Sequence, residues 1–256
     1  MKNFLIKNLF YCPVKSLSFN ESSVLKIVKE SGIHNDRIFA FTRGLDKKSS
    51  VDFNNSKIRN LNYFLTLKNT PDLKNYNFIF EEKKNILILY LKNKKLIETN
   101  INDKKEILDL EKYIEINIIK IKKPIFFILN KNFPFFDTTP GISISLINLN
   151  SIKDLENKMN ANIEYERFRG NILIDYLPAW EEFNLVGKTI KIGEVKFNVD
   201  SRIPRCSATN VNPNNSKLDM NLPNSLIKFY NHKDMGIYLS PLNSGKISTK
   251  DFIEVL

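Results

Sequence analysis

The chain has few of the residues that build metal or disulfide frameworks. Its 256 residues include only two cysteines, Cys12 and Cys206, and two histidines, His34 and His232. Two distant cysteines without a Cys-X-X-Cys pair provide no disulfide scaffold and fit a reducing, cytoplasmic location. Two histidines far apart in sequence provide no zinc site of ordinary ligand spacing.

The chain also lacks a long hydrophobic run. Its apolar stretches at residues 86–91 and 125–129 have the length of strands, whereas a spanning helix needs about 20 apolar residues. The N-terminus alternates apolar residues with Lys7 and Asn8, which is not the pattern of a signal peptide. We therefore expect no membrane segment.

Acidic residues are fewer than basic ones. The 39 basic and 28 acidic side chains give a net charge of +11, which is compatible with an anionic partner. The lysines are scattered, however, and no basic stripe with interleaved aromatic residues is visible. Nucleic-acid binding is therefore the weaker interpretation, and solvated surfaces account for the lysines.

Short apolar segments predict an α+β fold that is mostly β and built on barrel-like sheets. The predicted strands are residues 4–11, 23–29, 37–42, 63–67, 77–81, 86–91, 172–175, 189–192, 195–199, 235–239 and 251–255. Two loops are expected to close hairpins, Glu82-Lys83-Lys84-Asn85 and Gly193-Glu194. Glycine at the first position of the second loop predicts a type II′ turn.

Helices are predicted at three places. Residues 104–114 carry an apolar stripe with charged flanks. Residues 151–159 begin with Ser151 as the expected N-cap, and Asp154 follows in a loose capping-box pattern. Residues 222–230 begin with a proline in the first turn. We expect a domain boundary near the first of these helices, which gives domains over 1–103 and 104–256.

Two polar clusters in the N-terminal half could bind an anion. Pro13-Val14-Lys15-Ser16 places a lysine and a hydroxyl in a loop that proline stiffens; the alternative is a turn that ends a strand. Asp36-Arg37 opens an apolar strand, so Arg37 offers either an anion-binding fork or an ion pair at a strand edge. Taken alone, both clusters favour the structural alternative.

A third cluster is Glu166-Arg167-Phe168-Arg169-Gly170-Asn171-Ile172. Arg169 and Asn171 alternate, so in an extended segment both side chains would emerge on one face and line a pocket. The pair Gly-Asn is equally consistent with turn chemistry before a strand. The sequence favours neither of these two interpretations over the other.

The fourth cluster, Ser201-Arg202-Ile203-Pro204-Arg205-Cys206-Ser207-Ala208-Thr209, follows the Gly193-Glu194 hairpin. A thiolate is a soft ligand and a strong nucleophile, and nearby cations favour its ionised form. Free cysteine is often a buried packing residue, but the neighbours of Cys206 are polar. A functional role is therefore the favoured interpretation.

The four clusters occur together, in this order, in the MOSC proteins (molybdenum cofactor sulfurase C-terminal domain), which the chain resembles over essentially its whole length. It looks closest to the two-domain branch that includes the amidoxime-reducing component and related bacterial reductases. The matching segments are Tyr11-Cys12-Pro13-Val14-Lys15-Ser16-Leu17, His34-Asn35-Asp36-Arg37, Asn150-Ser151-Ile152-Lys153-Asp154-Leu155, Arg167-Phe168-Arg169-Gly170-Asn171-Ile172, Leu177-Pro178-Ala179-Trp180-Glu181-Glu182, Val186-Gly187 and Pro204-Arg205-Cys206-Ser207-Ala208-Thr209-Asn210-Val211-Asn212-Pro213. The ordered set is specific, although each motif alone is weak.

This resemblance implies an N-terminal β-barrel domain and a MOSC domain that is a mixed β-barrel with a few helices. It also implies a molybdenum cofactor (molybdopterin) in the cleft between them, with Cys206 as the metal ligand and catalytic residue. The implied cofactor-binding residues are Lys15, Ser16, Arg37, Ser151, Arg169, Asn171, Arg205 and Thr209. Thiolate suits the metal, and Arg or Lys suits the phosphate of the cofactor.

The implied activity is that of an oxidoreductase. Molybdenum would take an oxygen atom from an N-hydroxylated or N-oxide small molecule, while the protein supplies binding and orientation. A separate electron-transfer protein of ferredoxin, flavin or cytochrome type would restore the electrons, because the chain has no cysteines to ligate an iron–sulfur cluster. The alternative is a carrier that delivers the cofactor, or sulfur as a persulfide on Cys206.

The chain departs from the family pattern at two positions. Cys12 stands between the usual Tyr and the Pro-Val-Lys-Ser segment, and Gly170 stands where the family often has proline. No sulfurase domain that would bind pyridoxal phosphate is recognisable, so we do not expect that cofactor within this chain.

Overall fold

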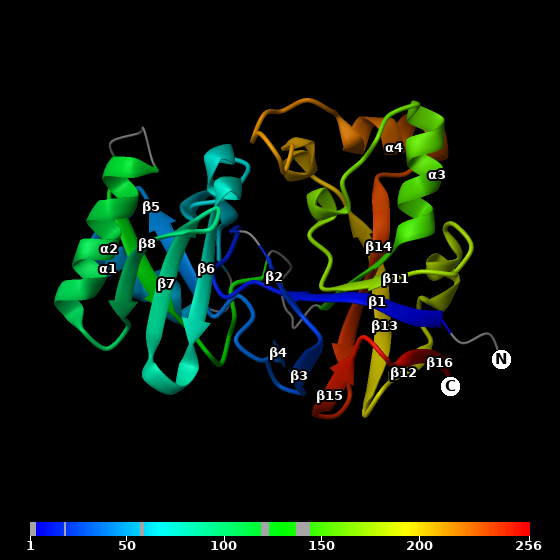
Figure 1. The fold of residues 1–256 in the computed structure, drawn as a ribbon, viewed down its shortest axis with the longest axis horizontal. Coiled ribbons are helices and arrows are strands. Elements are labelled where there is room, and N and C mark those ends of the chain that lie inside the picture. The colour runs from blue at the N-terminus through cyan, green and yellow to red at the C-terminus, as the bar shows by residue number, and fades with distance from the viewer. Residues whose placement is uncertain (1–3, 18, 57–58, 119–122, 137–143) are drawn as a thin grey trace. The chain divides into compact units, whose positions relative to one another are not determined.

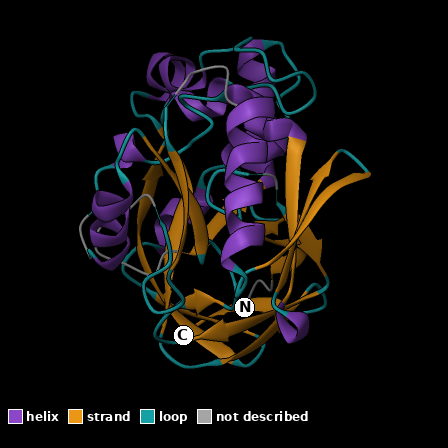
Figure 2. Cartoon of the chain, turned by 90° about the vertical axis from the view of Figure 1, so that its left-hand side faces the viewer, coloured by secondary structure: helices purple, strands orange, loops and turns teal. Residues whose placement is uncertain are grey.

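A computed structural model describes residues 4–17, 19–56, 59–118, 123–136 and 144–256. The chain divides into two compact units (Figure 1). Unit 1 comprises residues 1–11, 21–34 and 141–256, and unit 2 comprises residues 12–20 and 35–140. Strands outnumber helices (Figure 2), which confirms the predicted α+β, mostly β class. In the described part of the chain, no helix is both long and apolar enough to cross a membrane.

A closed barrel of seven strands forms the centre of unit 1 (Figure 1). Its strands are β1 (Phe4–Tyr11), β10 (Ile144–Asn148), β11 (Ile172–Ile174), β12 (Thr189–Ile192), β13 (Val195–Pro204), β14 (Asp234–Pro241) and β16 (Phe252–Val255). The ring closes because β1 pairs with β16 on one side and with β11 on the other. Strand β2 (Asn20–Ser22) adds to β1 outside the ring, and β3 (Val24–Val28), β4 (Gly32–Ile33) and β15 (Gly245–Ser248) form a separate small sheet.

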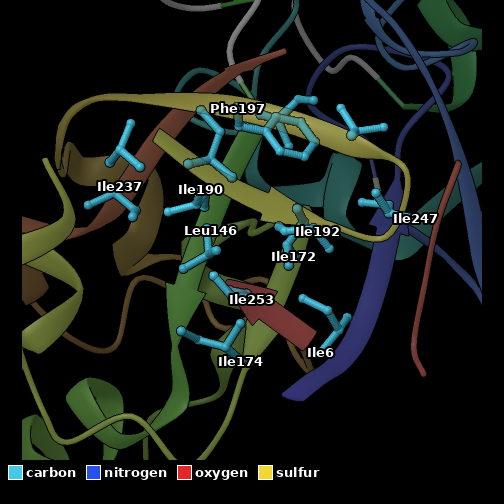
Figure 3. Packing of buried hydrophobic residues seen from close by; sticks show 14 of the residues in the cluster. Ile6, Leu146, Ile172, Ile174, Ile190, Ile192, Phe197, Ile237, Ile247 and Ile253 are labelled. Carbon is cyan, nitrogen blue, oxygen red and sulfur yellow. The ribbon is translucent and has the colours of Figure 1, made fainter. Parts of the chain in front are cut away.

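Alternation of apolar and polar residues produces this barrel. Along β13, Val195, Phe197 and Val199 are buried while the residues between them are exposed, because successive side chains of a strand point to opposite faces. Aliphatic side chains from most of the strands converge inside the barrel (Figure 3). Full burial of each of these side chains stabilises the folded state by about 1.5–3 kcal/mol. The core therefore holds the ends of the strands in place.

The hairpin between β12 and β13 forms as the sequence predicts. Ile192 pairs directly with Val195, and Gly193 takes φ 53°, the region that glycine enters without strain. The hairpin between β6 (Tyr76–Glu81) and β7 (Ile86–Leu91) is also confirmed, with Asn85 closing its loop at φ 56°.

Two helices lie beside each other at one end of the barrel (Figure 1). They are α3 (Leu149–Met159) and α4 (Leu222–Tyr230), and three short 3-10 helices accompany them: η4 (Tyr165–Phe168), η5 (Glu181–Leu185) and η6 (Ser207–Asn210). The predicted N-cap at Ser151 is wrong. Asn148 caps α3 by accepting from the Asn150 amide, and the Ser151 side chain is buried in the interior.

Unit 2 contains two small sheets around one aromatic-rich core. Its elements are β5 (Phe39–Arg43), α1 (Lys47–Asn55), η1 (Leu61–Tyr63), η2 (Pro71–Asn75), β6, η3 (Glu82–Lys84), β7, β8 (Lys94–Asn100), α2 (Lys104–Asn117) and β9 (Ile125–Leu129). Strand β5 pairs with β9, and β7 lies between β6 and β8. The rings of Phe39 and Phe80 meet edge to face with their centroids 4.9 Å apart, an arrangement that aromatic pairs prefer.

Two sequence expectations differ from what unit 2 contains. The strand predicted at 63–67 is wrong: residues Leu61–Tyr63 form a 3-10 helix, and Phe64 makes an isolated bridge to Thr42. Asn69 explains the difference, since its side chain bonds both the Thr66 amide and the Phe64 carbonyl and folds the segment into turns. The boundary expected near residue 104 lies inside unit 2, at the start of α2.

Candidate functional site

Cys206 lies in an accessible loop of unit 1, directly after β13. It is the N-cap residue of η6, and its thiol is exposed and free. Thr209 holds the loop from the other side, because its amide and its Oγ1 both donate to the Cys206 carbonyl, at 3.1 and 2.9 Å. The thiol is therefore presented to solvent from a main chain that is fixed.

Arg205, which precedes Cys206, points its side chain inward and fixes the loop on its N-terminal side. Its Nε donates to the Met235 carbonyl at 2.9 Å and its Nη1 to the Phe168 carbonyl at 2.8 Å, and Nη2 also bonds Met235 O. Burial of the guanidinium lowers the pKa of Arg205 to about 10, against the opposing influence of Tyr238 and of the neighbouring Cys206. Three of its five donors thus serve carbonyl groups of the protein, and Arg205 joins β13, η4 and β14.

Arg169 follows the carbonyl that Arg205 binds. It ends η4 in the left-handed region, at φ 53°. Of the two interpretations left open for Arg169 and Asn171, the structure therefore has the turn, because the chain takes a left-handed conformation at the first of the two residues. The turn nevertheless brings Arg169 to the same part of unit 1 as the Cys206 loop, through the bond between Arg205 and Phe168.

Asn171 is fully buried and joins three strands. Its Nδ2 donates to the Phe10 carbonyl at 3.1 Å, and its Oδ1 accepts from the Ser145 hydroxyl at 2.9 Å and from the Ser145 amide. Next to it, Gly170 fits a tight space: a Cβ there would lie 2.5 Å from Ile147 Cγ1. The Cβ of a proline at this position, which the family resemblance leads us to expect, would meet the same obstruction.

Ser151 lies inside unit 1 in a hydrogen-bonded group with a buried carboxylate. Its hydroxyl is 2.8 Å from both carboxylate oxygens of Glu182 and accepts from the Trp180 amide at 2.8 Å. Asn148 Nδ2 donates to the same carboxylate at 2.9 Å. Burial raises the pKa of Glu182, while the bonds from Asn148 and Ser151 act in the opposite direction.

The three remaining predicted residues, Lys15, Ser16 and Arg37, belong to unit 2. Lys15 is buried; its Nζ donates to the Phe135 carbonyl at 3.1 Å. Ser16 and Arg37 both take positive φ, 68° and 54°. The Arg37 amide donates to the Cys12 carbonyl at 2.6 Å, so the two segments run side by side.

Arg37 also forms the ion pair that the structural alternative predicted. Its Nη1 contacts Asp36 Oδ2, and the other oxygen of this buried carboxylate accepts from the Cys12 amide at 2.6 Å. The guanidinium lies over the rings of Phe19 and Phe136, 5.1 and 5.6 Å from their centroids. Asp36 and Arg37 thus brace the loop that carries Lys15.

Sequence reasoning did not find an aromatic patch in unit 1 that consists of Trp180, Phe183, Arg202, Tyr230 and His232. Ring centroids within the patch lie 4.3 to 5.9 Å apart, and the Arg202 guanidinium lies 4.3 Å above the Phe183 ring. The five residues span 180–232, so no local motif joins them. The Arg205 amide donates to the Lys233 carbonyl at 2.8 Å, which brings the patch and Cys206 to the same end of β13 and β14.

Cys206 belongs to no preformed metal site in the described part of the chain. Among the residues that the structure describes, no group of three or more His, Cys, Asp or Glu side chains is arranged to hold a metal ion. A soft metal that arrives with its own sulfur ligands in a cofactor, and needs one more thiolate, fits the exposed Cys206.

Comparison with known proteins finds a family similarity in the C-terminal part of the chain. The family model "MOSC domain" matches residues 138–254. Molybdenum cofactor sulfurases of Drosophila pseudoobscura pseudoobscura and Drosophila persimilis are each 28% identical over 100 residues, which cover 39% of this chain and 12% of the relatives. The match thus spans about an eighth of the length of those relatives.

Solved structures give weaker similarities. The YUAD protein from Bacillus subtilis aligns over 99% of this chain and 96% of its own, with a TM-score of 0.47 and 12% identity. YiiM from Geobacillus stearothermophilus aligns over 44% of this chain and 53% of its own, with a TM-score of 0.36 and 17% identity.

Proposed function

The chain carries a MOSC domain, over residues 138–254, and from this premise we propose that the protein is a molybdenum-dependent oxidoreductase. Its substrates are N-hydroxylated or N-oxide small molecules. The molybdenum cofactor, when bound, supplies the two-electron oxygen-transfer chemistry. The observation that carries the proposal is the exposed Cys206 thiol on a fixed loop of this domain.

Cys206 is the residue that would hold the metal. A thiolate is a soft ligand that suits a metal in a sulfur-rich cofactor. The Arg205 guanidinium bonds Phe168 and Met235, so its role in the proposal is to fix the Cys206 loop. Thr209 has the same role from η6, through its two bonds to the Cys206 carbonyl.

The other proposed cofactor contacts fall into two groups. Arg169 is proposed to bind the phosphate of the cofactor, because a cation suits that group. Lys15 and Arg37 make bonds within unit 2, so we propose that they fix the loop that also carries Ser16. Asn171 and Ser151 make their hydrogen bonds within the protein, so we assign them a positioning role. Asn171 holds β1, β10 and β11 together, and Ser151 holds α3 to Glu182.

Electrons would come from a separate ferredoxin, flavin or cytochrome protein. Cys12 and Cys206 form no disulfide with each other, which supports the reducing cytoplasm as the proposed compartment in which such a donor meets this protein.

Turnover tests the proposal. Protein from a host that makes the cofactor is mixed with a hydroxylamine-type substrate and a chemically reduced artificial donor. We expect reduction of the substrate by the wild type and by Ser207→Ala, which changes an exposed neighbour, and loss of reduction in Cys206→Ala. Molybdenum-loaded protein that shows no turnover but transfers its cofactor to an acceptor enzyme would instead support the carrier function.

A further inference from the structure

The aromatic patch is partly buried, and two of its polar hydrogens are already bonded within the protein. Trp180 Nε1 and the Tyr230 hydroxyl both donate to Asp154 Oδ2, at 2.8 and 2.7 Å. These two bonds lower the pKa of Asp154, so its charge is held at the base of the patch. Both rings are therefore fixed, with their own donors turned away from a ligand.

His232 keeps a donor in the patch. Its Nδ1 accepts from the Asp234 amide at 3.1 Å, so the proton of the neutral ring lies on Nε2. Burial and the Arg202 cation lower the pKa of His232, and Asp234 acts in the opposite direction. The imidazole is thus a neutral donor packed among the rings of Trp180, Phe183 and Tyr230.

Arg202 supplies the charge of the patch. It is exposed, its guanidinium lies 4.3 Å above the Phe183 ring, and it forms no ion pair with a carboxylate in the described part of the chain. Burial raises the pKa of the acid Glu182, and the Arg202 charge acts in the opposite direction; the Glu182 carboxylate is hydrogen-bonded by Ser151 and Asn148. Stacking orients the guanidinium before a ligand arrives, which reduces the entropy that binding costs.

We propose that Trp180, Phe183, Arg202, Tyr230 and His232 form a subsite for a planar aromatic carboxylate beside Cys206. Arg202 receives the carboxylate on its guanidinium fork, His232 donates a second hydrogen bond, and the rings cover the planar body. Only the claim that this ligand is a substrate, or part of one, rests on the proposed function.

The single tryptophan of the chain makes the subsite directly observable. Trp180 is the only tryptophan, so intrinsic tryptophan fluorescence reports on the patch alone. The full-length protein is titrated with benzoate, with benzamide as the uncharged isostere, and with acetate and inorganic phosphate as anions without a ring. We expect a saturable change with benzoate and at least about tenfold weaker binding of the other three, since a hydrogen bond to a charged group is lost or no ring is present.

Variants with matched charge identify the residues that bind. Arg202→Gln is expected to weaken benzoate binding about tenfold or more, because the charged fork is removed. Lys191→Gln removes the same charge from the exposed face of β12, and we expect binding within about twofold of the wild type at physiological salt. Thermal melts verify that both variants are folded.

Three results would overturn the subsite: no saturable change with benzoate, equal affinity for benzamide and benzoate, or unchanged affinity in Arg202→Gln. The assay needs no molybdenum, so its failure is distinguishable from failure of the proposed function. Benzoate binding to a protein that never acquires molybdenum would leave the subsite standing and refute the reductase. Turnover with equal KM for carboxylated and neutral substrates in the wild type would refute the claim that the ligand of the subsite is a substrate, and would leave the reductase standing.

Discussion

Gly170 gives the sharpest stability prediction, because the space for one methyl group is missing there. A Cβ would lie 2.5 Å from Ile147 Cγ1 and 3.0 Å from Leu173 Cδ2, and both side chains are buried. The backbone of Gly170 is not left-handed, so alanine is excluded by packing and not by φ. We therefore expect Gly170→Ala to destabilise the protein.

The magnitude follows from two opposing effects. Overpacking a core costs about 1–3 kcal/mol, and replacing glycine by alanine restricts the unfolded chain and returns about 0.4–1 kcal/mol. A contact of 2.5 Å lies at the severe end, so we expect a net loss of roughly 2 kcal/mol. Ile147→Ala alone should cost about 2–5 kcal/mol through the cavity it leaves.

The double variant tests the reasoning. In the Ile147→Ala background the obstructing Cγ1 is gone and the contact with Leu173 Cδ2 at 3.0 Å remains, so Gly170→Ala should cost clearly less than in the wild type. The coupling between the two substitutions should be about 1–3 kcal/mol. Urea unfolding followed by Trp180 fluorescence measures all four proteins, since Trp180 and Gly170 belong to the same unit. Additive effects, or a Gly170→Ala variant as stable as the wild type, would refute the steric account.

Further predictions concern the buried polar groups of unit 1. Asn171→Ala should lower the free energy of unfolding by about 1–3 kcal/mol, measured in urea, because the polar groups of Phe10 and Ser145 lose their buried partner. Burial raises the pKa of Glu182 in the folded protein; the unfolded chain then ionises first, and stability falls as the pH rises above the unfolded pKa. Glu182→Gln should remove this fall in a series of unfolding curves at different pH. Asp154 has a lowered pKa, so its stabilisation is lost as the pH falls through that value, and Asp154→Asn should abolish that acid-side loss.

Local patterns predict much of the barrel. The alternation along β13 and the glycine of the Gly193-Glu194 turn depend on neighbours in sequence, and both appear in the structure where the pattern indicates. The helices at 104–117 and 222–230 follow from their apolar spacing in the same way. The helix Lys47–Asn55 was missed, because Ser50 is its only buried residue and its sequence carries no apolar stripe.

The features that the sequence could not predict depend on contacts between segments that are distant in the chain. Ser151 fails as an N-cap because its hydroxyl finds Glu182, 31 residues away. Arginine is a residue type that often binds anions, yet the acceptors of the Arg205 guanidinium are the carbonyl groups of Phe168 and Met235. The division into two units could not be predicted from the sequence for the same reason, because each unit combines segments that are separated in the chain.

The aromatic patch also depends on contacts between distant segments. Trp180 and His232 are far apart in the sequence, and only the fold brings their ring centroids to a distance of 5.7 Å. Composition pointed to Cys206 because its polar neighbours are adjacent in sequence. The segments that lie around the Cys206 loop in space are η4, α4 and β14.

The molybdenum and pterin content of purified protein tests the central claim most directly. The wild type and Ser207→Ala, made in a cofactor-competent host, should carry both molybdenum and pterin, and Cys206→Ala should lose most of its molybdenum while it remains folded. Folded wild-type protein without molybdenum would contradict the account. Equal molybdenum in the wild type and Cys206→Ala would contradict the assignment of Cys206 as the metal ligand.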